Sequence, residues 1–186
     1  MLTDTNKRQY GPFDMVVSAI PAFQAANLMP DLAQKAGVQD VKMMACFTVM
    51  LGFKEDLNLP WGGAFISDHS LGFIAVNSSK PGREGGYSIV VQANNEWAED
   101  HIENDPENIE ANMHQALKQL TGIDANEAVL KSFHRWRYAA TKTPLGQPYV
   151  MDKEAGLVMI GDWCLKGRVE AAFESGLAAA QAVLSQ

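Results

Sequence analysis

The sequence predicts a mixed α/β (α+β) protein in which an antiparallel sheet is flanked by two strand–helix units. Four strand-like segments between residues 41 and 93 are separated by Gly-rich or polar turns, which is typical of an antiparallel meander. On either side, at 13–37 and 156–184, an apolar run of strand length is followed by helical periodicity. No repeat or linker-like change of composition interrupts this order.

The first unit opens with "FDMVVSAIP" (13–21), a continuous apolar run that predicts a strand buried on both faces. Helical sequence follows from Ala22, is interrupted at Pro30 and ends at Gly37, a residue suited to the position after a helix.

The central part begins with a long predicted strand, "VKMMACFTVMLGF" (41–53), followed by the shorter strands "GAFIS", "GFIAVNS" and "YSIVVQA". A helix is predicted to begin at Asp105-Pro106 and to end at Gly122. Its apolar face comprises Ile109, Met113, Ala116, Leu117 and Leu120. "VLKSFHRWRYA" (129–139) predicts a further strand.

The second strand–helix unit is "GLVMIG" (156–161) followed by the final helix. The strand would deliver Asp162 to the carboxyl edge of a sheet, where open α/β sheets bind ligands. Gly167 permits close backbone approach, and the helix start offers N–H groups and a positive dipole end. The alternative is a strand–turn–helix unit that only packs in the fold and binds no ligand. The helix stripe comprises Val169, Ala172, Phe173, Gly176, Leu177 and Ala180.

Composition narrows the function classes. The chain has 186 residues, a net charge of -7 and 47% hydrophobic residues, which argues for a globular protein and against a nucleic-acid surface. No apolar segment is long enough to span a membrane, and the N-terminal residues lack a signal-like apolar region, so we expect a cytoplasmic protein. Cys46 and Cys164 are expected to be core residues, and the four histidines show no metal-ligand spacing; His101 and His114 are expected to be exposed.

Five segments carry a family resemblance: "FDMVVSAIPAFQAANLMP", "LPWGGAFISD", "NSSKPGR", "HRWRYA" with "PLGQP", and "GLVMIGDWCLKGRVEAAFESGLAAA". In this order, from about Gly11 to Leu184, they resemble bacterial renalase-like proteins of the flavin-dependent amine oxidase superfamily. The resemblance implies a two-domain flavoprotein with non-covalently bound FAD and an antiparallel substrate domain. It also implies oxidation of dihydronicotinamide isomers, or of amines, with oxygen reduced to peroxide.

By the same resemblance, residues 1–40 and 151–186 belong to the FAD-binding domain and residues 41–150 form the substrate-binding domain. Gly161 and Asp162 would lie beside the ribityl-pyrophosphate of FAD. The helix start would approach the isoalloxazine edge, and a loop after the first strand would pass close to the cofactor. The residues implied at these two places are Gly167, Arg168, Val169 and Glu170, and Ala19, Ile20 and Pro21.

Strand alternation in "HRWRYA" puts His134, Trp136 and Tyr138 on one face and Arg135 and Arg137 on the other. We expect Trp136 and Tyr138 to line a pocket for a planar, nicotinamide-like ring. Core packing of the aromatic face, with the arginines on the outer surface, is the alternative.

Two further residues are candidates for substrate binding. Asn77, in the turn-rich "NSSKPGR", offers a polar contact, although this loop would serve equally well as a solvated turn. Trp61 in "LPWGG" would close a pocket or anchor its loop.

The dinucleotide fingerprint G-x-G-x-x-G is absent, since no two of the fifteen glycines are two positions apart. By comparison with the family, the half that carries the ADP-binding fold lies outside this chain, so the chain alone is expected to bind FAD poorly. It is expected to form a homo-oligomer or to join an N-terminal-half partner chain. A non-catalytic remnant that serves as an interaction module, and a nicotinamide-type ligand binder without redox function, remain the alternatives.

Overall fold

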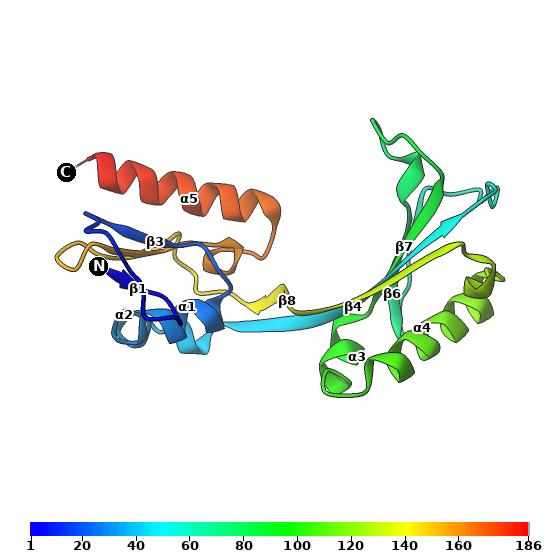
Figure 1. Cartoon of the computed structure of the whole chain (residues 1–186), viewed down its shortest axis with the longest axis horizontal. Helices are drawn as coiled ribbons and strands as arrows, with labels where there is room; N and C mark the ends of the chain where they lie inside the picture. Colours follow the sequence, from blue (N-terminus) through cyan, green and yellow to red (C-terminus); the bar gives the residue numbers. More distant parts are fainter. Residues whose placement is uncertain (186) are drawn as a thin grey trace. The chain divides into compact units, whose positions relative to one another are not determined.

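The structure, a computed structural model that describes residues 1–185, consists of two compact units, each with its own core (Figure 1). Unit 1 combines Met1–Met43 with the segment from Thr141 onward, and unit 2 comprises Met44–Ala140. The predicted mixed α/β class with antiparallel strands is confirmed. No helix in the described part of the chain is long and apolar enough to cross a membrane.

Unit 1 is built on a three-stranded sheet of order β3-β10-β9, in which β10 pairs in parallel with β3 and antiparallel with β9. The helices α1 and α2 pack on one face and α5 lies over the other (Figure 1). A small hairpin of β1 and β2 precedes the sheet. The elements are β1 (Leu2–Thr3), β2 (Gln9–Tyr10), β3 (Val16–Ser18), α1 (Ala22–Leu28), α2 (Pro30–Ala36), η1 (Val38–Asp40), β9 (Val150–Asp152), β10 (Leu157–Met159), η4 (Asp162–Cys164) and α5 (Val169–Leu184).

Local sequence explains the helix boundaries of unit 1. Pro30 is the first residue of α2, where the missing proline N–H costs no intrahelical bond. Gly37 ends α2 in the left-handed conformation, with φ of 73°. The predicted interruption at Pro30 and termination at Gly37 are therefore confirmed.

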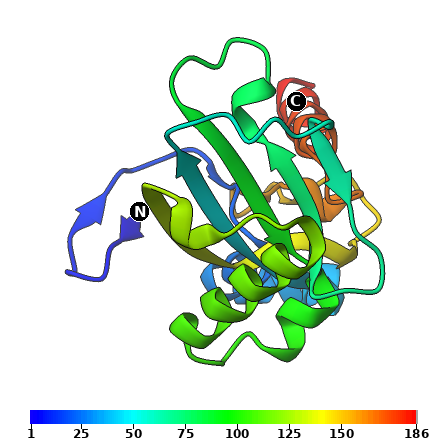
Figure 2. The same cartoon turned by 90° about the vertical axis from the view of Figure 1, so that its right-hand side faces the viewer.

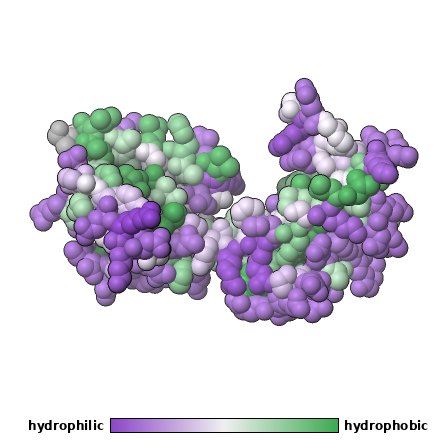
Figure 3. All heavy atoms as spheres, viewed as in Figure 1, coloured by the Kyte–Doolittle hydropathy of each residue, from purple (hydrophilic) through white to green (hydrophobic). Residues whose placement is uncertain are grey.

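One expectation about unit 1 is wrong in this structure: the strand predicted at 13–21 as buried on both faces is short, and Val17 in β3 is 52% exposed. The final helix buries Ala171, Ser175 and Ala179 and leaves Val169 and Phe173 of the predicted stripe 91% and 63% exposed. Apolar atoms accordingly gather on the surface over α5 (Figure 3).

Unit 2 is a five-stranded antiparallel sheet of order β5-β6-β7-β4-β8, and α3 and α4 cover one of its faces (Figure 2). Its core joins alternate residues of β4, including Phe47, Val49 and Leu51, to Ile109, Met113 and Leu117 of α4. The elements are β4 (Lys42–Phe53), β5 (Gly63–Phe65), β6 (Leu71–Val76), η2 (Asn77–Ser79), β7 (Tyr87–Ala93), α3 (Asn95–Asp100), α4 (Pro106–Thr121), η3 (Ala125–Glu127) and β8 (Leu130–Thr143).

The prediction for α4 is confirmed at both ends: the Asp105 side chain accepts a hydrogen bond from Glu107 N, and Gly122 follows in the left-handed conformation. Leu120, expected on the buried face, is instead exposed.

The sequence predicted that His101 and His114 are exposed, but the structure shows both side chains half-buried. His101 stacks on Trp97 and donates from Nδ1 to the Trp97 carbonyl oxygen at 2.8 Å. His114 is half-buried, and burial lowers its pKa.

Candidate functional site

The carboxyl ends of β3 and β10 lie together in unit 1. Because the two strands are parallel, with Met159 opposite Ser18, the segments that follow them leave the sheet at the same edge. The amide of Ile160 donates to the Ser18 carbonyl oxygen at 2.9 Å, and the Trp163 indole nitrogen donates to the Ile20 carbonyl oxygen at 3.0 Å. The structure therefore brings the predicted residues 19–21 next to 161–162.

A tight turn links this edge to α5. The amides of Leu165, Lys166 and Gly167 all donate to the carbonyl oxygen of Asp162, at 3.1, 3.1 and 3.0 Å. The hydroxyl of Thr141 donates to the Asp162 carboxylate at 3.3 Å. These bonds position the predicted residues Gly167 and Arg168 directly before the first turn of α5.

Two glycines allow close packing at the turn. A Cβ atom on Gly167 would lie 2.7 Å from Cβ of Thr141, and this glycine has a φ of +63°. A Cβ atom on Gly161 would clash with Nε1 of Trp163. Any larger residue at either position would displace the turn.

The N-terminus of α5 is open for a ligand. Arg168 occupies the N-cap position without a side-chain hydrogen bond to the first turn, and Val169 is almost fully exposed. A helix of 16 residues carries a positive dipole end there, and the side chain of its N-cap residue does not bond to the first-turn amides. Val169 and Glu170 therefore present backbone donors suited to an electron-rich or anionic group.

Sequence reasoning missed two serines that flank this edge. Ser175 is fully buried in α5, and its hydroxyl oxygen accepts a hydrogen bond from the Gly161 amide at 3.0 Å. Ser18, at the carboxyl end of β3, is buried, and its hydroxyl has no hydrogen-bond partner in the part of the chain that the structure describes. The buried face of α5 consists of the small residues Ala171, Ser175 and Ala179 at i, i+4, i+8 spacing, and this spacing is the sequence signal that could have identified it.

The sheet of unit 2 leaves one face without covering helices. On β8, Phe133 stacks on Phe47 with ring centroids 5.8 Å apart, and the Arg135 guanidinium lies over the same Phe47 ring. Alternation therefore directs Trp136 and Tyr138 toward the face opposite α3 and α4.

The arginines of β8 contact the helical side. Arg135 donates to the Asn104 carbonyl oxygen at 2.7 Å, and Arg137 forms two bonds to the Glu103 carboxylate at 2.6 and 3.1 Å. This pairing lowers the pKa of Glu103. Trp136 is 52% exposed, so the alternative of core packing is wrong for this residue, whereas Arg137 does lie at the surface, as that alternative expected.

A cavity of about 580 Å³ crosses the uncovered face near one end of the sheet. Its lining reaches from Phe65 and Phe73, whose rings lie 4.6 Å apart, past Gln92 and Cys46 to Ala140. Elsewhere on β8, the strand that supplies Ala140, the rings of His134 and Trp136 lie 4.0 Å apart, but the predicted residues Trp136 and Tyr138 do not line this cavity. The uncovered face thus combines aromatic rings with a hollow large enough for a small molecule.

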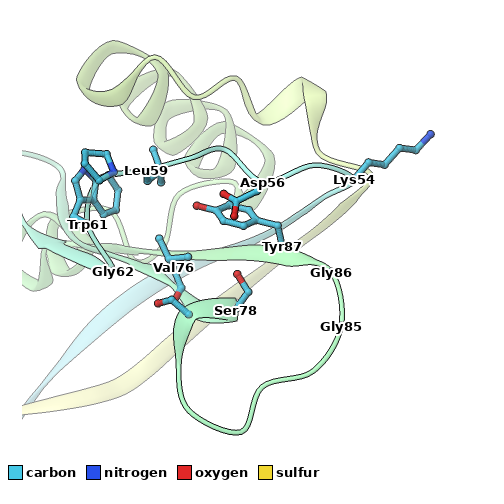
Figure 4. Close-up of a pocket in the computed structure, with 12 residues that line it drawn as sticks. Lys54, Asp56, Leu59, Trp61, Gly62, Val76, Ser78, Gly85, Gly86 and Tyr87 are labelled. Carbon is cyan, nitrogen blue, oxygen red and sulfur yellow. The ribbon is translucent and has the colours of Figure 1, made fainter.

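Trp61 and the turn that begins at Asn77 meet at a different place. Trp61, Ser78 and Ser79 line a second cavity of about 660 Å³ near the carboxyl end of β4 (Figure 4). Trp61 packs against the core cluster on the helical side of the sheet. The structure therefore brings two predicted loops together, but separates them from Trp136 and Tyr138.

Both cysteines are buried and free, as predicted for core residues. Burial raises the pKa of the Cys164 thiol to about 11 and also raises that of Cys46.

Comparison with known proteins identifies the family. The family model described as flavin containing amine oxidoreductase matches residues 2–184, nearly the whole chain. The chain belongs to this family. The family's description names a flavin and an oxidoreductase activity.

Solved structures share the fold at low sequence identity. A protein described as a protoporphyrinogen oxidase from Exiguobacterium sp. 255-15 is 16% identical, with a TM-score of 0.67 over 93% of this chain. Cyclohexylamine oxidase from Brevibacterium oxydans IH-35A is 16% identical, with a TM-score of 0.64 over 91%. Putrescine oxidase bound to putrescine is 14% identical, with a TM-score of 0.60 over 92%. The chain spans only 42 to 43% of the length of these proteins.

Proposed function

We propose that the chain provides the substrate-binding sheet and the second flavin-contacting segment of a renalase-like FAD-dependent oxidase. The reaction is the two-electron oxidation of a dihydronicotinamide isomer or an amine, with O₂ reduced to H₂O₂. Bound FAD would supply the redox chemistry by taking up the two electrons of the substrate and passing them to oxygen. The observation that carries the proposal is the convergence of β3, β10 and the open N-terminus of α5 at one edge.

The residues at this edge fit a flavin. The first-turn amides of α5 would donate to an electron-rich ring edge, and the glycines at 161 and 167 keep the backbone turn compact. The buried Ser18 hydroxyl, which has no partner in the described chain, offers a further donor near the ends of the strands. Ala19, Ile20 and Pro21 would form the wall beside it.

The uncovered sheet face supports a planar, uncharged substrate ring. Within unit 2, the described strand residues on that face include Cys46, Thr48 and Gln92 with Phe73 and Trp136, and none is Asp, Glu, Lys or Arg. An alkylammonium placed there would lose hydration without a carboxylate to pair with, whereas a dihydropyridine ring would stack on aromatic side chains. This favours the dihydronicotinamide alternative, with Trp136 and Tyr138 as lining residues.

The proposal divides the chain by role. Residues 1–40 and 151–186 would join the FAD-binding domain, and residues 41–150 would form the substrate-binding domain. The fingerprint for the ADP part of FAD would come from a segment outside this chain, so the chain alone would hold the cofactor weakly.

Exposed apolar residues support association with such a segment. Val17 on the free edge of β3 and Val169, Phe173 and Leu177 on α5 are all exposed. An N-terminal-half partner with a parallel strand and an apolar layer would cover them. Homo-oligomerisation through the same surface is the second candidate, and it would suit a non-catalytic interaction module.

The test supplies the chain with FAD and a separately expressed dinucleotide-binding domain that carries G-x-G-x-x-G. Peroxide release is measured with isomeric dihydronicotinamides and with primary amines. We expect turnover of the dihydronicotinamides. Trp136→Ala should lower the turnover rate about tenfold or more, because losing about 1.4 kcal/mol of ring stacking corresponds to a factor of ten. Unchanged kinetics in this variant would remove the uncovered face from the substrate site.

Light scattering on the chain alone separates the two candidates. A dimer at micromolar concentration that dissociates when the dinucleotide-binding domain is added supports the enzyme part. A dimer that persists, with no peroxide produced, supports the interaction module. A monomer of 20.3 kDa that does not bind the added domain would contradict both the enzyme part and the interaction module.

A further inference from the structure

The cavity near the carboxyl end of β4 lies on the helical side of the unit 2 sheet, away from the proposed substrate face. Its volume is about 660 Å³. The loop after β4 supplies Asp56 and Trp61, the turn after β6 supplies Ser78, and β7 begins there with Tyr87 (Figure 4). Gly85 and Gly86 line one side of the cavity with backbone only, and the cavity is open to solvent.

Tyr87 has an unsatisfied polar group at this cavity. Its ring packs edge-on against Phe53, and its hydroxyl oxygen is buried with no hydrogen-bond partner among the described residues. In Figure 4 the hydroxyl end points from β7 toward Asp56 and the side of the cavity that carries Trp61. Burial and the negative charge of Asp56 both raise the pKa of Tyr87, so this hydroxyl stays neutral. A buried hydroxyl without a partner costs free energy that a ligand donor would recover.

The charge at the cavity is negative. Asp56 uses one carboxylate oxygen to accept a hydrogen bond from Asn58 N at 2.7 Å, and no ion pair within the described residues neutralises it. Lys54 also lines the cavity, but its ammonium group points away from the other lining side chains (Figure 4). The Ser78 hydroxyl oxygen accepts from Ser88 N at 3.3 Å, and this bond does not use its own O–H.

We propose that this cavity is a second small-molecule site, which binds a primary alkylammonium. The ammonium N–H groups would donate to the free oxygen of Asp56 and to the Tyr87 hydroxyl oxygen, and the alkyl chain would lie on the Trp61 ring. A carboxylate, a neutral acceptor and an indole face together recognise an organic cation better than a neutral molecule or an anion. The site is independent of the proposed flavin edge, and it would sense amines without oxidising them.

The test is a titration of the ¹⁵N-labelled full chain with n-butylammonium chloride, followed by amide and indole chemical shifts. 1-Butanol and sodium butyrate serve as neutral and anionic probes of the same length. Asp56→Asn keeps an oxygen that can accept from Asn58 N, so it removes the charge without removing the turn. Glu55→Gln is the matched control, because it removes the same charge from an adjacent residue that does not line the cavity.

We expect butylammonium to shift signals from residues 54–62 and 76–87. Asp56→Asn should weaken this binding about fivefold, or about 1 kcal/mol, the value of an exposed charge pair. Glu55→Gln should change it less than about twofold, and Tyr87→Phe should weaken it about threefold through loss of one acceptor.

Three results would overturn the proposal: equal binding of butanol, tighter binding of butyrate, or equal effects of Asp56→Asn and Glu55→Gln. Equal effects would assign the binding to general charge attraction. If Asp56→Asn does not fold, unchanged butylammonium binding by Tyr87→Phe would be sufficient to reject the site.

Discussion

Replacing Gly167 by Ala should disrupt the turn that leads into α5. Gly167 has a φ of +63°, a conformation that L-residues adopt at a cost of about 1 to 2 kcal/mol. The added Cβ would lie 2.7 Å from Cβ of Thr141 and 3.0 Å from its backbone nitrogen. Rotation of the Thr141 side chain relieves neither contact, because both atoms are fixed by the backbone.

The expected loss of stability combines these two effects. Overpacking against a fixed neighbour costs about 1 to 3 kcal/mol, so Gly167→Ala should destabilise unit 1 by about 2 to 5 kcal/mol in total. Gly146→Ala provides the matched control, since Gly146 has a φ of +84° with nothing within 4 Å of the added Cβ. That variant should lose only the conformational part, about 1 to 2 kcal/mol.

The assay is urea denaturation followed by the NMR signal of the indole N–H of Trp163, which is buried in the core of unit 1, with residues in unit 2 monitored separately by hydrogen exchange. The difference between the two variants measures the contact with Thr141. Equal losses for Gly167→Ala and Gly146→Ala would refute the close approach, and with it the position assigned to the start of α5.

Three further predictions concern buried groups. Ser175→Ala should lower the free energy of unfolding by about 1 to 3 kcal/mol, because the Gly161 amide loses its acceptor; a loss within about 0.5 kcal/mol in urea denaturation would contradict this. Burial lowers the pKa of His114 below its ordinary 6.5, so the unfolded chain takes up this proton first and stability is lost as the pH falls below about 6.5. His114→Gln should therefore reduce the fall in Tm between pH 7.5 and pH 5.5, and an unchanged fall would oppose the assignment. Burial raises the pKa of Cys164 to about 11, so its thiol should resist iodoacetamide at pH 8 in the folded chain and react after unfolding, as read by mass spectrometry; rapid labelling of the folded chain would disagree.

The strands and helices of unit 2 were predictable because local signals agree with tertiary packing. Asp105-Pro106 and Gly122 mark the ends of α4 by their backbone chemistry alone. The long apolar segment 41–53 has no proline and a single glycine near its end, and it forms the single strand β4, Lys42–Phe53. Strand alternation was sufficient to separate Trp136 and Tyr138 from the arginines of β8, although it could not decide which face the helices cover.

The environment of unit 1 was less predictable, because hydropathy identifies apolar residues without identifying what covers them. Val17 and Phe173 are apolar yet exposed, since the edge of β3 and the outer face of α5 have no neighbour in the described chain. Ser175 escaped detection because its partner, the Gly161 amide, is 14 residues away and the hydrogen bond depends on the tertiary fold. The cavity beside Asp56 likewise requires three segments to meet.

The most direct test of the flavin assignment is an NMR titration of the chain with FAD up to millimolar concentration. Weak binding is expected, because losing three contacts of about 1.5 kcal/mol each weakens affinity by a factor on the order of a thousand. The account predicts that the shifted amide signals belong to Ala19, Ile20, Gly161, Asp162 and the segment 167–170. Shifts confined to unit 2, or no shifts at millimolar FAD, would contradict the proposal that β3, β10 and α5 form the flavin-facing edge.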